Sequence, residues 1–369
     1  MKLKLLTIVI IILALLALVL PRLYKPRNKN VGTKNAHIQI SPSPEIIDNS
    51  INVSLFIPYW QIPKANNEIY FPDIEFISMF QLVNYFAIKP GSDGVNKSDN
   101  GYLQLTKFST LSAALKTDSN LVLAMTNTNQ NLLILNDQKK IIKLIEEVIV
   151  LTDKYQFNGI LVDLELSTLN NKKITGQVTE FFRIFNETVA DRDIKLGLIV
   201  YGDVFYRLRP YDLNKINPYI DTIYLMAYDL HKTLGTPGPN FPLNGKEKFG
   251  TDLATTVDTI TKLIDVNKVY VIFGLYGYDW LVDSEKRPIR AAKALPLNNI
   301  KANFIDKCVW KNCVISRDPQ ATENEINYVD DNGELHIVWY EDEQSVNKKI
   351  KYLKSLGIDN FSYWVWGYY

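Results

Sequence analysis

The chain has 369 residues, 47% of them hydrophobic, which is enough to bury one large core. Its formal net charge is only +1, and its lysines are scattered along the sequence. Nucleic-acid-binding proteins use a concentrated positive surface, so we expect no nucleic-acid partner. The three histidines, His37, His231 and His336, do not stand at the spacing of metal ligands, and we expect neither a metal site nor a cofactor.

An uncharged apolar segment runs from Leu5 to Leu20 and is preceded by Lys2 and Lys4. It is either the apolar region of a signal peptide or a short membrane anchor, since a spanning helix needs about 17–25 residues. No small-residue cleavage site follows it. We therefore predict a signal anchor, or transmembrane segment, over residues 1–22.

Residues 23–50 are predicted to form a linker, because they are rich in Asn, Pro and Ser and lack periodic apolar positions. Several cations between Arg22 and Lys34 outnumber those before the apolar segment. By the positive-inside rule, this distribution would place the body of the protein in the cytoplasm.

From residue 51 to residue 369, short apolar runs alternate with helical patterns, as in a parallel sheet covered by helices. This α/β pattern predicts a (β/α)8, or TIM, barrel. Strands are expected near Val53–Tyr59, Phe76–Phe86, Leu121–Met125, Gly159–Glu165, Lys195–Tyr201, Thr222–Tyr228, Lys268–Leu275 and Asn360–Trp366. The clearest helical patterns cover Asp137–Tyr155, Thr175–Ala190, Ala254–Asp265 and Ser345–Leu356.

The alternation breaks between Trp280 and Trp339. A hairpin pattern is visible there, with Ile326–Val329 as one strand, an Asp-Asp-Asn-Gly turn, and a return strand that begins at Leu335. The same stretch holds the only two cysteines, Cys308 and Cys313. In an exported chain an even number of cysteines allows a disulfide, which here would close a short loop.

The most informative segment for function is Phe157–Glu165, with the sequence F-N-G-I-L-V-D-L-E. Side chains alternate along a strand, so Leu161, Asp163 and Glu165 are expected on one side, with the two carboxylates roughly 6–7 Å apart along the chain. Neighbouring buried carboxylates perturb each other's pKa, which is what a general acid near neutral pH requires. The alternative is a strand that ends in a solvated acidic tip.

This segment resembles the fourth-strand motif D-G-x-D-x-D-x-E of glycoside hydrolase family 18, the chitinase-like barrels. Four further elements resemble the same family in the same order: the M-x-Y-D sequence, a P-G-P loop, a seventh strand with its exit, and the entry into an eighth strand with its tryptophan. The M-x-Y-D sequence is Met226–Asp229, and the P-G-P loop is Pro237–Leu243. The seventh strand with its exit is Val271–Trp280, and the entry into the eighth strand is His336–Asp342, followed by Phe361–Trp364 with the tryptophan. The P-G-P and H-x-V-W elements are similar to those of the bacterial cell-wall and spore-cortex branch. Residues 281–338 resemble the small α+β insertion between strands seven and eight that many members carry.

The resemblance implies substrate-assisted retaining hydrolysis, in which the 2-acetamido group of the bound sugar is the nucleophile. Glu165 would protonate the leaving oxygen, and Asp163 would orient the acetamido group. Tyr228 and Asp229 would assist from the end of the sixth strand. The resemblance therefore implies Glu165, Asp163, Tyr228 and Asp229 as the catalytic residues.

Aromatic side chains make up 12% of the chain, and sugars bind largely through stacking on such rings. Trp364 would form the floor under the reactive sugar. Tyr59, Tyr201, Tyr278 and Trp280 are further candidates for substrate binding, although core packing is an equal alternative for each of these four.

Leu161 departs from the family motif, which has an aspartate at this position. An apolar side chain leaves Asp163 without the carboxyl group with which it would share a proton. The consequence for activity is open.

The leading interpretation is a glycosidase of the chitinase or N-acetylglucosaminidase type, acting on β-1,4 linkages in peptidoglycan or chitin-like glycans. A polysaccharide substrate of this kind favours an extracytoplasmic, membrane-anchored protein, or a secreted one if the amino-terminal segment is cleaved. The alternative is a non-catalytic, chitolectin-like barrel that binds carbohydrate at the cell envelope. Such barrels usually lose the final glutamate of the motif, whereas Glu165 is present.

Overall fold

The computed structural model describes residues 52–62, 74–167 and 171–368. The predicted membrane segment at residues 1–22 and the linker at residues 23–50 lie outside these ranges. Within the described ranges, no helix is both long enough and apolar enough to cross a bilayer.

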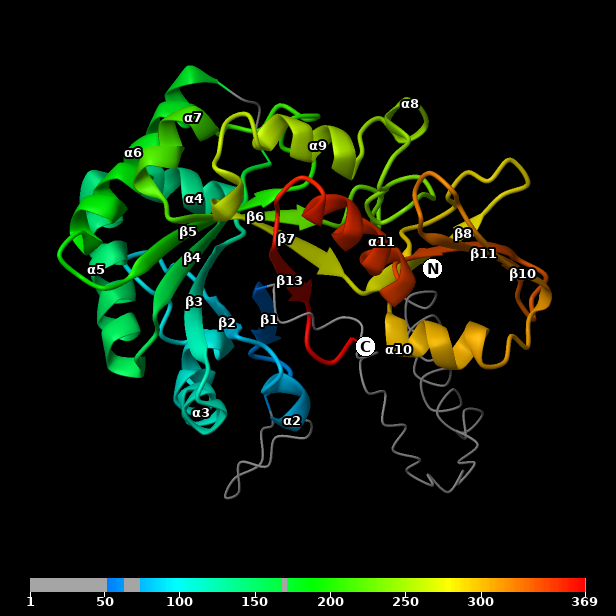
Figure 1. The fold of residues 1–369 in the computed structure, drawn as a ribbon, viewed down its shortest axis with the longest axis horizontal. Helices are drawn as coiled ribbons and strands as arrows, with labels where there is room; N and C mark the ends of the chain where they lie inside the picture. The colour runs from blue at the N-terminus through cyan, green and yellow to red at the C-terminus, as the bar shows by residue number, and fades with distance from the viewer. Residues whose placement is uncertain (1–51, 63–73, 168–170, 369) are drawn as a thin grey trace, which may run out of the picture. The chain divides into compact units, whose positions relative to one another are not determined.

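Parallel strands close into a barrel in the order β1-β13-β7-β6-β5-β4-β3-β2, which confirms the predicted TIM-barrel architecture (Figure 1). The barrel closes where β1 pairs with β13. The strands are β1 (Asn52–Pro58), β2 (Leu82–Ile88), β3 (Asp118–Met125), β4 (Gly159–Leu164), β5 (Lys195–Tyr201), β6 (Thr222–Ala227), β7 (Val269–Gly274) and β13 (Asn360–Trp364).

One predicted strand boundary is wrong. The second strand was expected from Phe76, but Ile74–Ile77 forms the short helix α2 and the strand begins at Leu82. The ring of Phe76 packs edge-on against that of Phe80, with centroids 5.3 Å apart. A short apolar run does not distinguish a strand from a buried helical turn, so tertiary packing decides this boundary.

The longer helices surround the barrel, and Figure 1 shows α3, α5 and α6 outside β2 to β5. α5 begins after Asp137, whose carboxylate accepts hydrogen bonds from the amides of Lys139 and Lys140 as an N-cap. The helical elements of the barrel are α2, α3 (Asn100–Leu115), α4 (Thr128–Leu135), α5 (Gln138–Tyr155), α6 (Lys172–Val189), α7 (Leu213–Ile216), α8 (Lys246–Phe249), α9 (Leu253–Ile260) and α11 (Glu343–Lys354), with 3-10 turns at Asn217–Tyr219 and Val266–Lys268.

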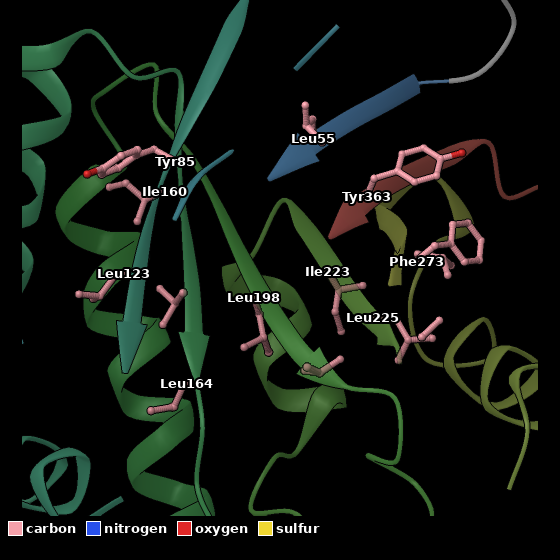
Figure 2. Close-up of a cluster of buried hydrophobic side chains, with 14 of the residues drawn as sticks. Leu55, Tyr85, Leu123, Ile160, Leu164, Leu198, Ile223, Leu225, Phe273 and Tyr363 are labelled. Carbon is pink, nitrogen blue, oxygen red and sulfur yellow. The ribbon is translucent and has the colours of Figure 1, made fainter. Parts of the chain in front are cut away.

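Side-chain alternation divides the barrel strands between two cores. On β4, Ile160 and Leu164 point outward into the layer between strands and helices, together with Leu123 and Leu198 of neighbouring strands (Figure 2). Leu161 instead belongs to a second cluster of buried side chains that fills the barrel interior. The predicted register of the fourth strand is therefore confirmed, with Leu161 and Asp163 on the inner face.

A second, antiparallel sheet lies between β7 and β13 in the sequence, with the order β10-β11-β12-β8-β9. The predicted hairpin is present, because β11 and β12 pair antiparallel. The elements are β8 (Tyr276–Val282), β9 (Lys293–Pro296), α10 (Leu297–Ile300), a π-helical turn at Lys301–Ile305, β10 (Lys311–Arg317), β11 (Asn324–Val329) and β12 (Leu335–Tyr340). We call the segment from Tyr276 to Tyr340 the insertion. It contains the predicted Cys308–Cys313 disulfide, which closes the short loop before β10.

Candidate active site

A cavity of about 260 Å³ lies at the carboxyl ends of the barrel strands, where TIM-barrel active sites are found. Most residues predicted from the sequence meet in it. Those that line it are Asp163, Glu165, Tyr201, Tyr228, Asp229, Tyr278 and Trp364.

Asp163 is the buried member of the carboxylate pair. Its residue is only 4% exposed, and its Oδ1 atom has no hydrogen-bond partner among the described residues. Burial raises the pKa of Asp163 well above its usual value, and the charge of Glu165 raises it further. A buried polar atom without a partner is unusual, and here it is positioned to accept a hydrogen bond from a ligand.

Glu165 follows the last residue of β4 and is partly exposed in the cavity. The Tyr201 hydroxyl donates a hydrogen bond to Glu165 Oε2 at 2.8 Å. The main chain is fixed as well, because Asn131 Nδ2 donates to the carbonyl oxygens of Glu165 at 2.9 Å and of Met125 at 2.5 Å. Glu165 is thus a carboxylate of defined orientation at the edge of a cavity.

Tyr201 is itself held by a cation. The Arg209 guanidinium lies 3.8 Å from the centre of the Tyr201 ring, and two Arg209 nitrogens donate to the Asp203 carboxylate at 2.9 Å each. A stacked, bidentate arginine has little rotational freedom. This arrangement fixes the hydroxyl that contacts Glu165.

Asp229 lies just beyond β6 with a backbone φ of 60°, a left-handed conformation that is uncommon for a residue with a side chain. Its Oδ1 atom accepts hydrogen bonds from the hydroxyls of Tyr276 and Tyr278, the latter at 2.7 Å. Burial and the Asp229 charge raise the pKa of both tyrosines. Both hydroxyls therefore keep their protons and remain donors to Asp229.

Trp364 and Tyr228 form an aromatic surface in the cavity. Their rings are stacked at a 24° interplanar angle with centroids 6.1 Å apart. Phe86 packs edge-on against Trp364 at 4.7 Å. Such a fixed aromatic face is suited to the apolar C–H surface of a sugar ring.

Trp280 and Tyr59 are not among the residues that line the cavity. Trp280 is fully buried beside the ring of Tyr278, and its indole N–H donates to the Gly235 carbonyl at 3.0 Å. Tyr59 packs against Trp60, with ring centroids 5.0 Å apart. The structure therefore does not bring these two residues into the cavity with the other predicted site residues.

Sequence reasoning missed two residues that organise the site, Asn131 and Arg209. Tyr276 is one of the aromatic residues for which the sequence leaves packing and sugar stacking as equal alternatives, and it stands two residues before Tyr278, so a strand places both on one face. Asn131 and Arg209 belong to segments whose sequence gives no sign of a contact with β4 or β5.

The described residues contain one group of metal-ligand side chains, Asp330, Glu334 and His336, at the turn between β11 and β12. The Asp330 carboxylate already accepts hydrogen bonds from the amides of Asn332 and Glu334. His336 Nδ1 lies 2.9 Å from Asp279 Oδ1. None of these residues lines the cavity, and we assign no metal to them.

Asp163 gives a test of the site that requires no substrate. Its folded-state pKa is raised, so above about pH 4 the folded protein holds a proton that the unfolded chain has released. This stabilisation is complete at low pH and is lost as the pH rises through the raised pKa. Asp163→Asn cannot titrate. We therefore expect the free energy of unfolding of the variant to rise relative to that of wild type as the pH increases from about 4 to 8, by up to about 1.4 kcal/mol per pH unit, and its melting temperature to rise with it.

The measurement is a thermal melt of both proteins at several pH values. Asp258→Asn, which alters an exposed carboxylate paired with Lys262, is the control and should show no such trend. A constant difference between Asp163→Asn and wild type over this pH range would mean that Asp163 is ionised normally in the folded protein.

One protein family matches most of the chain. A family model described as "Glycosyl hydrolases family 18" matches residues 56–368. YdhD of Bacillus subtilis (strain 168), provisionally named a sporulation-specific glycosylase, is 23% identical over 325 residues, covering 86% of this chain and 72% of that protein.

Two solved structures share the fold at low sequence identity. The spore cortex-lytic enzyme SleL of Bacillus cereus has a TM-score of 0.68 at 19% identity, covering 86% of this chain and 71% of that chain. The Group IV chitinase of Ostrinia furnacalis has a TM-score of 0.72 at 15% identity, covering 85% of this chain and 92% of that chain.

Proposed function

This chain belongs to glycosyl hydrolase family 18 and is a glycoside hydrolase, and we propose that it cleaves β-1,4 bonds beside N-acetylglucosamine by substrate-assisted retaining catalysis. The observation that carries the proposal is the pair on one face of β4, with Asp163 buried and Glu165 at the cavity. On this strand, one accessible acid beside one buried carboxyl group suits a reaction in which the substrate supplies the nucleophile.

Glu165 is proposed as the general acid. It donates its proton to the glycosidic oxygen. At the same time, the acetamido carbonyl oxygen of the N-acetylglucosamine unit attacks the anomeric carbon of that unit, and the rest of the glycan leaves as an alcohol. The resulting carboxylate then takes a proton from the water that opens the oxazolinium ion. The Tyr201 hydroxyl at 2.8 Å stabilises and orients this carboxylate.

Asp163 is proposed to accept a hydrogen bond from the acetamido N–H of the substrate. Its Oδ1 atom is buried and has no partner among the described residues, so this hydrogen bond would satisfy it. The same contact would fix the carbonyl oxygen towards the anomeric carbon and place the partial negative charge of the Asp163 oxygen beside the oxazolinium ion. Tyr228 and Asp229 line the same cavity and are proposed to complete the acetamido pocket.

We further propose an extracytoplasmic protein, anchored by residues 1–22, that acts on peptidoglycan. The Cys308–Cys313 disulfide supports this location, because such bonds persist in oxidising compartments. The similarity to a glycosylase named for sporulation and to a spore cortex-lytic enzyme favours a bacterial cell-wall glycan over chitin.

The proposal is tested by comparing acetylated and de-N-acetylated substrates. Purified cell walls and chitin oligomers are incubated side by side with the protein, and the release of reducing ends is measured before and after de-N-acetylation. We expect de-N-acetylation to lower kcat/KM by at least about a hundredfold, because it removes the nucleophile. A thiazoline analogue of the oxazoline should inhibit competitively.

Equal rates on both forms would exclude the substrate-assisted mechanism. Binding of the oligomers without any release of reducing ends would instead identify a carbohydrate-binding barrel. Faster release from chitin oligomers than from cell walls would overturn the choice of peptidoglycan.

A further inference from the structure

The left-handed backbone at Asp229 is held by the side chain and the main chain of one residue, Asn240. The Asp229 amide donates to Asn240 Oδ1 at 2.8 Å, and the Leu230 amide donates to the Asn240 carbonyl at 2.9 Å. A left-handed conformation at a residue with a side chain persists only where its surroundings impose it. Asn240 therefore determines where the Asp229 carboxylate meets the hydroxyls of Tyr276 and Tyr278.

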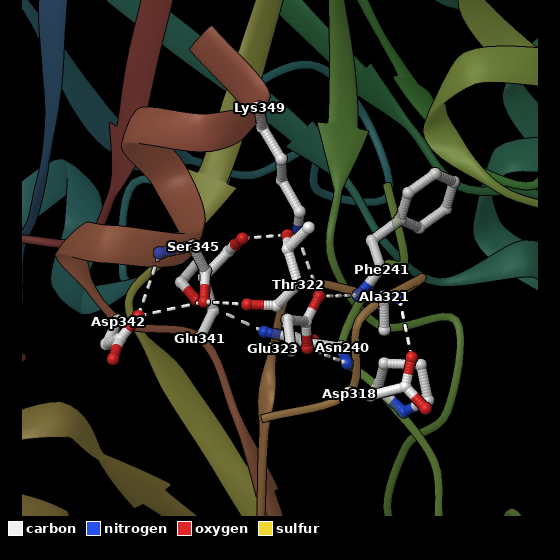
Figure 3. Close-up of polar contacts among 12 residues, drawn as sticks. Asn240, Phe241, Asp318, Ala321, Thr322, Glu323, Glu341, Asp342, Ser345 and Lys349 are labelled. Carbon is white, nitrogen blue, oxygen red and sulfur yellow. Dashed lines mark hydrogen bonds and ion pairs between the residues drawn. The ribbon is translucent and has the colours of Figure 1, made fainter. Parts of the chain in front are cut away.

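Asn240 is in turn held by a carboxylate from the insertion. Both oxygens of Glu323 accept main-chain hydrogen bonds, Oε2 from the Asn240 amide at 2.5 Å and Oε1 from the Phe241 amide at 2.8 Å (Figure 3). Asn240 Nδ2 also donates to the Gly274 carbonyl at the end of β7, at 3.2 Å. The loop after β6 is thus tied to the insertion on one side and to the barrel on the other.

Glu323 belongs to a fully buried charged cluster. Lys349 of α11 donates to Glu323 Oε1 at 2.8 Å and also to Glu341, and all three side chains have 0% exposure. Burying such groups is costly, and apolar residues of similar volume often give equal or greater stability. A contribution to stability is therefore a weak explanation for the presence of these buried charges. The cluster lies where the insertion, α11 and the loop after β6 meet.

We propose that Glu323 is a positioning residue for the reaction: oriented by Lys349, it fixes Asn240, and through Asn240 it sets the place of Asp229 in the cavity. The proposal rests on the proposed function for its catalytic consequence. Three donors converge on Glu323, namely two main-chain amides and the Lys349 ammonium group. Only a carboxylate, with two acceptor atoms and a negative charge, satisfies all of them.

The first test variant is Glu323→Gln, which keeps the shape but turns one acceptor into a donor that faces another donor. The second is Asn240→Ala, which removes the acceptor for the Asp229 amide without altering any charge. The control is Lys301→Met, which removes a different ion pair between the insertion and α11, to Glu343. Steady-state kinetics on cell-wall glycan and amide hydrogen exchange are measured for all three at a temperature where each is folded.

We expect both test variants to lower kcat at least about tenfold with KM changed less than about threefold, because misplacement acts on the transition state more than on binding. Exchange at the Asp229 and Leu230 amides should accelerate at least about tenfold in both. The control should stay within about twofold of wild type in both measurements.

Equal effects in the control and the test variants would overturn the proposal and leave Glu323 as a structural residue. Faster exchange with unchanged kcat would also overturn it, because the contact would then have no catalytic consequence. If the wild-type protein were inactive, the proposed function would be contradicted instead. Hydrogen exchange would still test the proposal in that case, because unchanged exchange in Glu323→Gln and Asn240→Ala would show that Glu323 and Asn240 do not position Asp229.

Discussion

Glu165→Gln should lower kcat by at least about 10²–10⁴-fold, since Glu165 is the accessible carboxylate on the catalytic face of β4 and the amide cannot donate the proton. The substitution keeps the size of the side chain, and Tyr201 can still donate a hydrogen bond to the amide oxygen. Binding of an N-acetylglucosamine oligomer, measured by calorimetry, should therefore remain within about tenfold of wild type.

Glu187→Gln is the matched control for this prediction. Glu187 lies on α6 with its side chain 61% exposed and paired with Arg183, and its removal should leave kcat unchanged. If turnover in Glu165→Gln equalled that of the control, another group would have to supply the proton and the assignment of Glu165 would be lost.

Leu161→Asp should destabilise the protein by about 2–5 kcal/mol, because Leu161 is 2% exposed in the barrel interior. Leu161 packs into the space beside Gly197, where its Cδ2 atom lies 2.5 Å from the place that a Cβ would occupy. An aspartate leaves this space unfilled and introduces a carboxyl group two residues before Asp163, whose pKa is already raised.

Leu161→Asn separates the two effects, since it loses the same apolar contact without adding a titratable group. The introduced carboxyl group would be protonated in the folded state and ionised in the unfolded chain above about pH 4. The aspartate variant should thus lose stability relative to the asparagine variant as the pH rises from about 4 to 8. Parallel denaturant titrations measure this difference, and identical pH dependence of the two variants would contradict the inward orientation of position 161.

The absence of a carboxylate at position 161 also bears on the mechanism. In this chain Asp163 has Glu165 as its charged neighbour on the strand, and the side chain beneath it is apolar. Glu165 is therefore the one acidic neighbour along this strand with which Asp163 can exchange a proton. If Leu161→Asp also shifts the acidic limb of the pH–activity profile, the added carboxyl group interacts electrostatically with Asp163 and Glu165.

The sequence alone determined the features that depend on local periodicity. The alternation along Phe157–Glu165 placed Leu161 and Asp163 on one face of a strand, and the structure confirms that face as the barrel interior. The even number of cysteines in a chain expected to be exported allowed a disulfide between Cys308 and Cys313, and the structure contains it. In each case the relevant geometry is contained within a few residues of chain, so the covalent structure sets it.

The tertiary structure alone decided how distant segments meet at the cavity. Trp280 and Tyr278 stand on the same strand with the same alternation, yet Tyr278 contacts Asp229 while Trp280 is covered. Asn240 and Glu323 are 83 positions apart, and their contact depends on how the insertion packs on the barrel. Such contacts follow from burial and hydrogen bonding across the whole fold, which local periodicity does not specify.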